Sequence, residues 1–334
     1  GAGNPAPFSL MPGENCSGIC PPNACNIYTP EKHSKPIAIT NRFLDHMPGS
    51  LSKPCITIII VMLLILSGCG QLVANAKKDF AEDLSATMLE QNDPETVKQA
   101  VPAYLILVSS MIKGDPDNVE LLISGSKLYG AYASVFVEER ERKQRLSALS
   151  LDYAQHAFCV YKPEACNFRE LSYYEFEQVL QQFNKEDAPV LFALGSAWAG
   201  WLQANSADWN AVAELPRIKA IIQRVLELDP LINNGDAYLY MAVMESFLPP
   251  AMGGKPELAK NNFEQAIKVS NGENLMAKLL YAEKYARLVF DKPLHDRLLR
   301  EVINARVENN ESTLINSIAQ YKARVLLDGS DDYF

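Results

Sequence analysis

Thiol and imidazole side chains are the groups in this sequence best suited to chemistry, because they bind metals and act as nucleophiles or bases. The sequence holds seven cysteines and four histidines. Three of the cysteines, Cys16, Cys20 and Cys25, lie close together near the start. No histidine follows them at a spacing typical of zinc sites, so we predict no metal site and no bound cofactor.

Cys159 and Cys166 flank a short segment in which Pro163 ends a helical pattern. In an oxidising compartment the two thiols could close a small loop through a disulfide. The sequence does not tell whether their geometry permits this bond. Two ordinary thiols are an equally good interpretation.

The motifs of common enzyme classes are missing from the sequence. There is no His-Glu-x-x-His, no Gly-x-Ser-x-Gly and no phosphate-binding loop. His156 lies among apolar residues at helical spacing, where a structural role is commoner than a catalytic one. Gly253-Gly254-Lys255 lacks the earlier glycine and the following serine or threonine of a phosphate loop, so it predicts a turn that opens a helix. We therefore predict that the protein is not an enzyme.

The charge balance argues against nucleic acid as a partner. The chain has 40 acidic and 31 basic residues, which gives a formal net charge of −9. The charges are spread along the sequence, so no basic face is indicated that would attract a phosphate backbone. We predict no binding to DNA or RNA.

Aromatic and methionine side chains form the other candidate site. They fall on the expected first helices of successive helix pairs, which in helical arrays line a concave surface suited to a peptide or an apolar small molecule. The alternative is that most of them belong to the core, which is the commoner role for any single one. Trp201 and Phe247 are the first to test. The candidates for ligand binding are Trp198, Trp201, Tyr238, Met241, Phe247 and Tyr281.

The apolar residues that position these groups recur at helical spacing. Val101, Leu105, Val108 and Ile112 run along one face, and so do Leu146, Leu149, Tyr153, Ala157 and Val160. Strand-like alternation is almost missing, so the pattern predicts an all-α fold. Dipeptides that end in proline separate the apolar stretches and predict helix starts, because aspartate caps free amides and proline fits the first turn. These pairs are Asp93-Pro94, Asp115-Pro116, Asp229-Pro230 and Lys255-Pro256.

A repeat is visible in the order of these helices. Ala259, Phe263 and Ala266 resemble the second helix of a tetratricopeptide repeat, in which small residues let helices approach and an aromatic ring fills the gap. Its first helix would contain residues 238–242. A generic helical bundle is the alternative. We predict an irregular tetratricopeptide-like array of about four helix pairs with a C-terminal capping helix at 315–327. The looser pairs lie at 122–161, at 191–225 with an extra loop around Trp209, and from Ala282 onward.

An export signal precedes the helical part. Residues 56–66 are an apolar run of about 11 residues that follows Lys53 and ends in Ser67, Gly68 and Cys69. The run is well short of the roughly 20 residues of a membrane-spanning helix. Its Leu-Ser-Gly-Cys ending resembles the lipobox of bacterial lipoproteins, which implies cleavage before Cys69 and a diacylglycerol on its sulfur. A buried helix, or an ordinary signal peptide with an incidental cysteine, is the alternative.

The sequence then divides into three parts. Residues 47–68 form the lipoprotein signal peptide, and residues 69–334 form the exported helical domain. Residues 1–46 are rich in proline and have no helical or strand period. Because Met47 offers a normal start for a signal peptide, we expect residues 1–46 to be disordered or no part of the natural protein.

The lipobox, the acidic irregular repeats and residues 248–266 together resemble the T-component of tetratricopeptide-associated TRAP transporters. The likeness covers roughly residues 70–327. Its most specific part is Gly-Gly-x-Pro-Glu-x-Ala-x-x-x-Phe, which begins at Gly253, and residues 279–282 also fit.

The resemblance implies a lipoprotein that faces the periplasm, is anchored to a membrane by its N-terminal lipid and pairs with the transporter's solute-binding protein. It also implies a helical protein that forms trimers and has a cleft or pore for apolar ligands such as organic acids with hydrophobic tails. The family offers no fixed ligand motif, so the aromatic candidates depend on this sequence alone. A scaffold for envelope protein complexes, with no small ligand, is the competing function.

Overall fold

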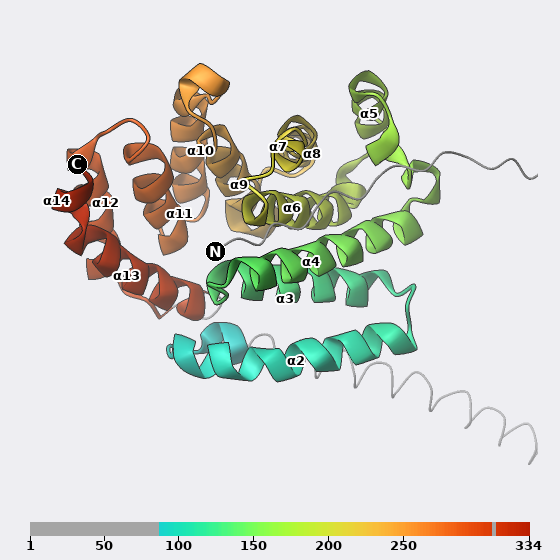
Figure 1. Cartoon of the computed structure of the whole chain (residues 1–334), viewed down its shortest axis with the longest axis horizontal. Coiled ribbons are helices and arrows are strands. Elements are labelled where there is room, and N and C mark those ends of the chain that lie inside the picture. Colours follow the sequence, from blue (N-terminus) through green and yellow to red (C-terminus); the bar gives the residue numbers. More distant parts are fainter. Residues whose placement is uncertain (1–86, 309–311) are drawn as a thin grey trace, which may run out of the picture. The chain divides into compact units, whose positions relative to one another are not determined.

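A computed structural model of the chain describes residues 87–308 and 312–334, which all belong to one compact unit, Gly70–Phe334. The predicted leader 1–46, the signal peptide 47–68 and Cys69 lie outside the described residues. Within those described ranges the chain contains helices and no strand, so the predicted all-α fold is confirmed (Figure 1). No helix in this part combines the length and the apolar character that crossing a bilayer would need.

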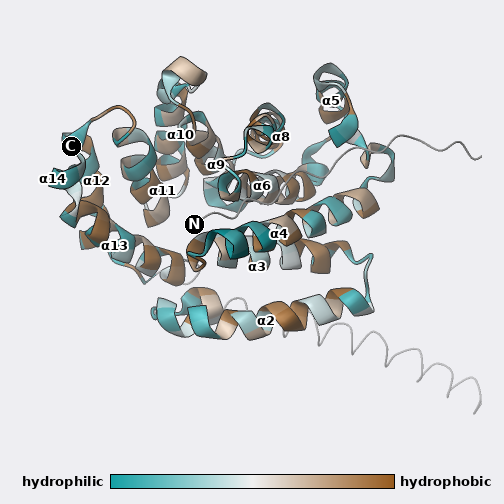
Figure 2. Cartoon of the chain, viewed as in Figure 1, coloured by the Kyte–Doolittle hydropathy of each residue, from teal (hydrophilic) through white to brown (hydrophobic). Residues whose placement is uncertain are grey.

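The long helices are joined by short 3-10 turns and loops. Around most helices hydrophobic and hydrophilic residues alternate (Figure 2). The helices are α2 (Pro94–Gly114), α3 (Val119–Val135), α4 (Arg140–Tyr161), α5 (Tyr173–Leu180), α6 (Ala188–Ala204), α7 (Trp209–Val212), α8 (Leu215–Leu228), α9 (Asp236–Glu245), α10 (Pro256–Val269), α11 (Leu275–Leu280), the π-helix η6 (Tyr281–Ala286), α12 (Lys292–Asn304), α13 (Thr313–Asp328) and α14 (Ser330–Tyr333). The 3-10 turns are η1 (Pro163–Ala165), η2 (Phe168–Glu170), η3 (Lys185–Asp187), η4 (Ile232–Gly235) and η5 (Pro250–Met252).

The dipeptides that end in proline do not all start helices. Asp93 caps α2 by accepting a hydrogen bond from the amide of Glu95, and Pro256 begins α10, as predicted. Asp115 and Asp229, however, are the C-terminal caps of α2 and α8. The prediction of a helix start was wrong at these two positions. A residue before proline is forced out of the helical region, and here that constraint ends the preceding helix.

Successive helices pack as pairs. The pairs are α3 with α4, α6 with α8, α9 with α10, and α11 with η6 and α12, and α7 lies in the long loop of the second pair. In α10 the three residues that suggested a repeat, Ala259, Phe263 and Ala266, are all buried. The small alanines let α10 lie close to its neighbours while the ring fills the space between them.

The buried face of α4 differs from the predicted one. Of the predicted face only Ala157 is buried, whereas Leu146, Leu149, Tyr153 and Val160 are half-buried. The other small residues buried on this helix are Ser147, Ser150 and Ala154. The reason is a close approach of α3 and α4, in which Ser150 donates a hydrogen bond to the carbonyl of Ser126. Large side chains do not fit at such a contact and lie on its flanks.

Helix α13 does more than cap the last pair. It packs on α11 and α12, and its residues Leu314 and Ile318 also belong to a hydrophobic cluster with Val97, Val101 and Leu105 of α2. The first and last long helices of the described part are therefore in contact, and the series of pairs closes on itself.

Candidate functional site

The six predicted ligand-binding side chains divide by exposure. Trp198, Met241 and Tyr281 are almost fully buried, with exposed fractions of 0%, 5% and 4%. The other three, Trp201, Tyr238 and Phe247, are half-buried and reach the surface. Half of the predicted set therefore has a place in the core, which is the alternative that the sequence left open.

The six residues also divide between two hydrophobic clusters. Trp198, Trp201, Met241 and Phe247 pack in the cluster built by α6, α8 and α9, whereas Tyr238 and Tyr281 pack in the cluster around α10 and α12. The structure does not bring them into one site.

Tyr281 makes structural contacts through its ring and through its hydroxyl. It stacks on Phe263 with ring centroids 5.1 Å apart, and its hydroxyl donates to Glu264 over 3.3 Å. Burial, followed by the charge of Glu264, raises the pKa of Tyr281 well above its ordinary value. The hydroxyl therefore stays protonated and acts as a donor within the fold.

The accessible part of the first cluster contains a residue that the sequence reasoning missed. The guanidinium carbon of Arg169 lies 4.3 Å from the ring centroid of Trp198 and 6.0 Å from that of Trp201. Its Nη1 donates to Oε1 of Gln155 over 3.3 Å. Among the described residues, no carboxylate approaches Arg169 within the 4.0 Å of an ion pair.

Burial lowers the pKa of Arg169, and the nearby charges of Glu214 and Asp152 raise it in part. The charged guanidinium thus loses hydration and gains no direct ion pair in return. A half-buried cation on aromatic faces can attract an anion, because the charge and hydrogen bonds of a bound anion would replace the water that the cation has lost.

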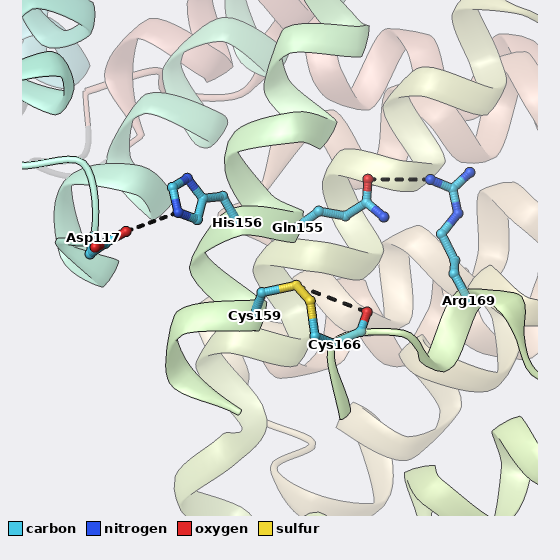
Figure 3. Close-up of a disulfide and its surroundings, with 6 residues drawn as sticks. All are labelled: Asp117, Gln155, His156, Cys159, Cys166 and Arg169. Atoms are coloured by element: carbon cyan, nitrogen blue, oxygen red, sulfur yellow. Dashed lines mark hydrogen bonds and ion pairs between the residues drawn. A yellow bond between two sulfur atoms is a disulfide. The ribbon is translucent and has the colours of Figure 1, made fainter. Parts of the chain in front are cut away.

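The segment that carries Arg169 is fixed at both sides. Helix α4 ends at Tyr161, and Cys159 and Cys166 are joined as a disulfide across the turn that follows (Figure 3). Beyond η2, the carbonyl of Leu171 accepts a hydrogen bond from Nη2 of Arg217 over 2.5 Å. These two restraints hold the short η2 turn, and with it Arg169, against α6.

A second, more polar place lies between α5, α8 and α9. It is a groove with a volume of about 460 Å³, and Met241 is the only predicted ligand-binding residue that lines it. At its floor Lys219 forms an ion pair with Glu245, with Nζ and Oε2 2.6 Å apart. Further charged residues of both signs also line it, namely Glu177, Arg224, Glu227 and Lys255.

A Ser-His-Asp cluster occurs in the C-terminal part, but its geometry is not catalytic. The buried ring of His295 has Nδ1 3.0 Å from Oδ1 of Asp296, and the hydroxyl of Ser330 donates to that same oxygen. In a catalytic triad the histidine meets serine and carboxylate through opposite nitrogens. Here the serine lies on the Nδ1 side and is 2% exposed, so the cluster joins α14 to α12.

The comparison with known families matches most of the described part. A family model described as TRAP transporter T-component matches residues 90–334, which is more than two thirds of the chain. This chain belongs to the TRAP transporter T-component family. The predicted resemblance is thereby confirmed, and membership makes the protein an accessory component of a TRAP transporter. No curated protein matches the chain in sequence.

The match also places the structural features described above. It covers every helix from α2 to α14, the segment with Arg169 and the polar groove. The T-component family is a transport accessory family, and the described residues contain no group of histidine, cysteine or acidic side chains that could hold a metal ion.

Proposed function

We propose that this T-component is a lipoprotein on the periplasmic side of a membrane, where it docks the transporter's solute-binding protein and binds an apolar or organic-acid ligand. The observation that carries the proposal is the family match over residues 90–334. The apolar run with Cys69 at its end supports the lipid anchor. The half-buried rings of Trp201 and Phe247 support the ligand.

Docking is tested with the exported part, residues 69–334, carrying an affinity tag. The partner is the solute-binding protein encoded beside it, and an unrelated periplasmic binding protein serves as the control. We expect the cognate protein alone to be retained and to bind in a titration by calorimetry. Equal retention of both proteins, or of neither, would contradict docking and favour a scaffold role.

The lipid anchor is tested by substitution of its attachment residue. Cells expressing the full chain are labelled with radioactive palmitate and separated into membrane and soluble fractions. We expect label and membrane association in the parent protein and loss of both in C69S, because serine has no thiol for the diacylglycerol. A labelled C69S protein would refute the lipidation site.

Ligand retention is tested by native mass spectrometry of the purified exported part. We expect an apolar ligand in the parent protein and less of it in W201A and F247A. The matched control is W209A, because Trp209 is 67% exposed on the short α7 and lies outside both hydrophobic clusters. The same spectra report self-association, for which we expect a trimer. Unchanged ligand in both variants would exclude these rings as its contacts.

A further inference from the structure

We propose that Arg169 and the ring of Trp201 form the binding site for the carboxylate and the adjoining apolar chain of the ligand. This inference rests on the proposed ligand-binding function and names the residue that would hold the anionic end.

The first argument is the unused hydrogen-bonding capacity of Arg169. A guanidinium has five N–H donors in a planar fork, and within the described residues Arg169 makes one hydrogen bond, to Gln155. The other terminal nitrogen points away from Gln155 (Figure 3). A carboxylate is the acceptor that matches two parallel donors of this fork.

The second argument is the orientation that the rings impose. Trp198 is fully buried beneath the guanidinium, at 4.3 Å from its centroid, so the cation lies against a surface that cannot move away. A ring against one face of the guanidinium leaves the donors at its edge open to a ligand. The indole N–H of Trp198 is also buried without an acceptor in the described part of the chain, so a second donor beside the cation is unused.

The third argument is the apolar surface beside the cation. Trp201 is half-buried 6.0 Å from the guanidinium carbon, and Leu171, also half-buried, packs against the same cluster. A ligand whose carboxylate meets Arg169 would therefore lay its next carbons on these side chains. A carboxylic acid with an alkyl tail fits this arrangement better than a small inorganic anion, which would leave Trp201 unused.

The nearby charges predict the sign of a second effect. Arg217 is a further cation near Arg169, whereas Glu214 and Asp152 are the carboxylates whose charges act on it, Glu214 more strongly. One oxygen of Glu214 is buried without a hydrogen-bond partner among the described residues. Its negative charge opposes an incoming anion, so neutralising Glu214 should tighten binding.

The test is a titration of the exported part with octanoate, followed by tryptophan fluorescence. Trp209 is replaced in all samples by W209F, so that the signal comes from Trp198 and Trp201. Octanol is the matched neutral probe of equal chain length. We expect octanoate to change the fluorescence and octanol to act only at far higher concentration, because octanol has no charge to meet the guanidinium.

Three variants separate this site from a structural role. R169Q should weaken octanoate binding by about tenfold or more, and R169K by less, because lysine keeps the charge without the fork. E214Q should tighten binding a few-fold, an effect that a merely structural residue would not produce. The control is R297Q, because Arg297 is exposed and paired with Glu301. Circular dichroism tests whether each variant is folded. If R169Q does not fold, R169K takes its place in the comparison.

The outcomes are distinguishable from those of the proposed function. Octanoate binding that survives R169Q unchanged, equal binding of octanol, or weaker binding in E214Q would each overturn the assignment to Arg169. An absence of octanoate binding in the parent protein would overturn it as well. Retention of the solute-binding protein by R169Q, measured in the pull-down, would then show that docking stands without this site.

Discussion

Gly254 occupies a turn that has no room for a side chain. A Cβ built on it would overlap the carbonyl oxygen of Leu248, which is backbone and cannot rotate away. We expect G254A to lower the free energy of unfolding by about 2 kcal/mol or more, because the turn between α9 and α10 must open. Urea denaturation followed by circular dichroism measures the change.

The control for that substitution is G114A. Gly114 is the last residue of α2, and nothing lies within 4 Å of a Cβ placed there. Alanine favours the helix, so G114A should leave stability unchanged or raise it slightly. Equal losses in the two variants would mean that the contact at Leu248 is not the cause.

Asp236, in the first turn of α9, should make stability depend on pH. Burial raises its pKa from 3.8 to about 6, against the charge of Lys127, which lowers it. In the folded state ionisation is therefore unfavourable, so this carboxyl costs free energy above pH 6 and nothing below pH 4. We expect D236N to be more stable than the parent by on the order of 2 kcal/mol at pH 8.

The gain in D236N should shrink as the pH falls through 6 and vanish near pH 4. Thermal unfolding of both proteins across this range gives the difference, and D328N, at an exposed position, is the control. A constant difference at all pH values would rule out titration of Asp236 as its origin.

The kinds of side chain at the candidate site were easier to predict from the sequence than the role of each individual residue. Trp198 and Trp201 are aromatic neighbours on a helix, and their spacing predicted a candidate surface. Arg169 could not be predicted, because it lies in a separate turn that only the fold brings over the two rings. The nearest signal was Pro163 with the cysteines on either side, which marked the segment as a fixed turn.

Among the elements, α10 makes the clearest prediction about packing. Phe263 is fully buried and stacks on Tyr281. F263A should lower the free energy of unfolding by about 3–4 kcal/mol, because it removes apolar contacts and leaves a cavity. L258A, on the exposed side of the same helix, should cost far less. Chemical denaturation decides, and similar losses would contradict the assigned faces.

Helix type was predictable from spacing, but helix boundaries were less so. Asp-Pro has one meaning before a helix and another after it, and local sequence does not separate them. At Asp93 the apolar period begins afterwards, whereas at Asp229 it has just ended, and the turn η4 follows. The buried face of α4 was misassigned for a related reason, because its contact with α3 favours small residues over large ones.

For the molecule as a whole, the cluster of His295, Asp296 and Ser330 fixes the C-terminal helix α14 to α12. Ser330 is buried and donates to Asp296, while Lys292 and His295 bind the same carboxylate. Burial raises the pKa of Asp296, but these hydrogen bonds outweigh it and hold the pKa well below its ordinary value.

S330A should lower the free energy of unfolding by about 1–3 kcal/mol, because a charge-assisted hydrogen bond is lost in a buried place. The matched control is S134A, which removes a hydroxyl from an exposed position on α3. Differential scanning calorimetry measures both. Unchanged stability of S330A would show that the hydrogen bond from Ser330 to Asp296 contributes nothing to the stability of the fold.

The contact between α13 and α2 was beyond reach from sequence. The capping helix was visible as an apolar pattern, but the partner of Leu314 and Ile318 lies more than 200 residues away, and pairing over such a distance leaves no local signature. Repeat patterns predict contacts between neighbours, so they describe an open series by default.

That contact limits how such a protein can evolve. An open array gains or loses one unit by duplication or deletion, because each unit meets only its neighbours. Here an additional pair would displace α13 from Val97 and Val101 and leave both surfaces facing water. Selection should therefore keep the number of helix pairs constant. Related chains should vary in loop length but have the same number of helices.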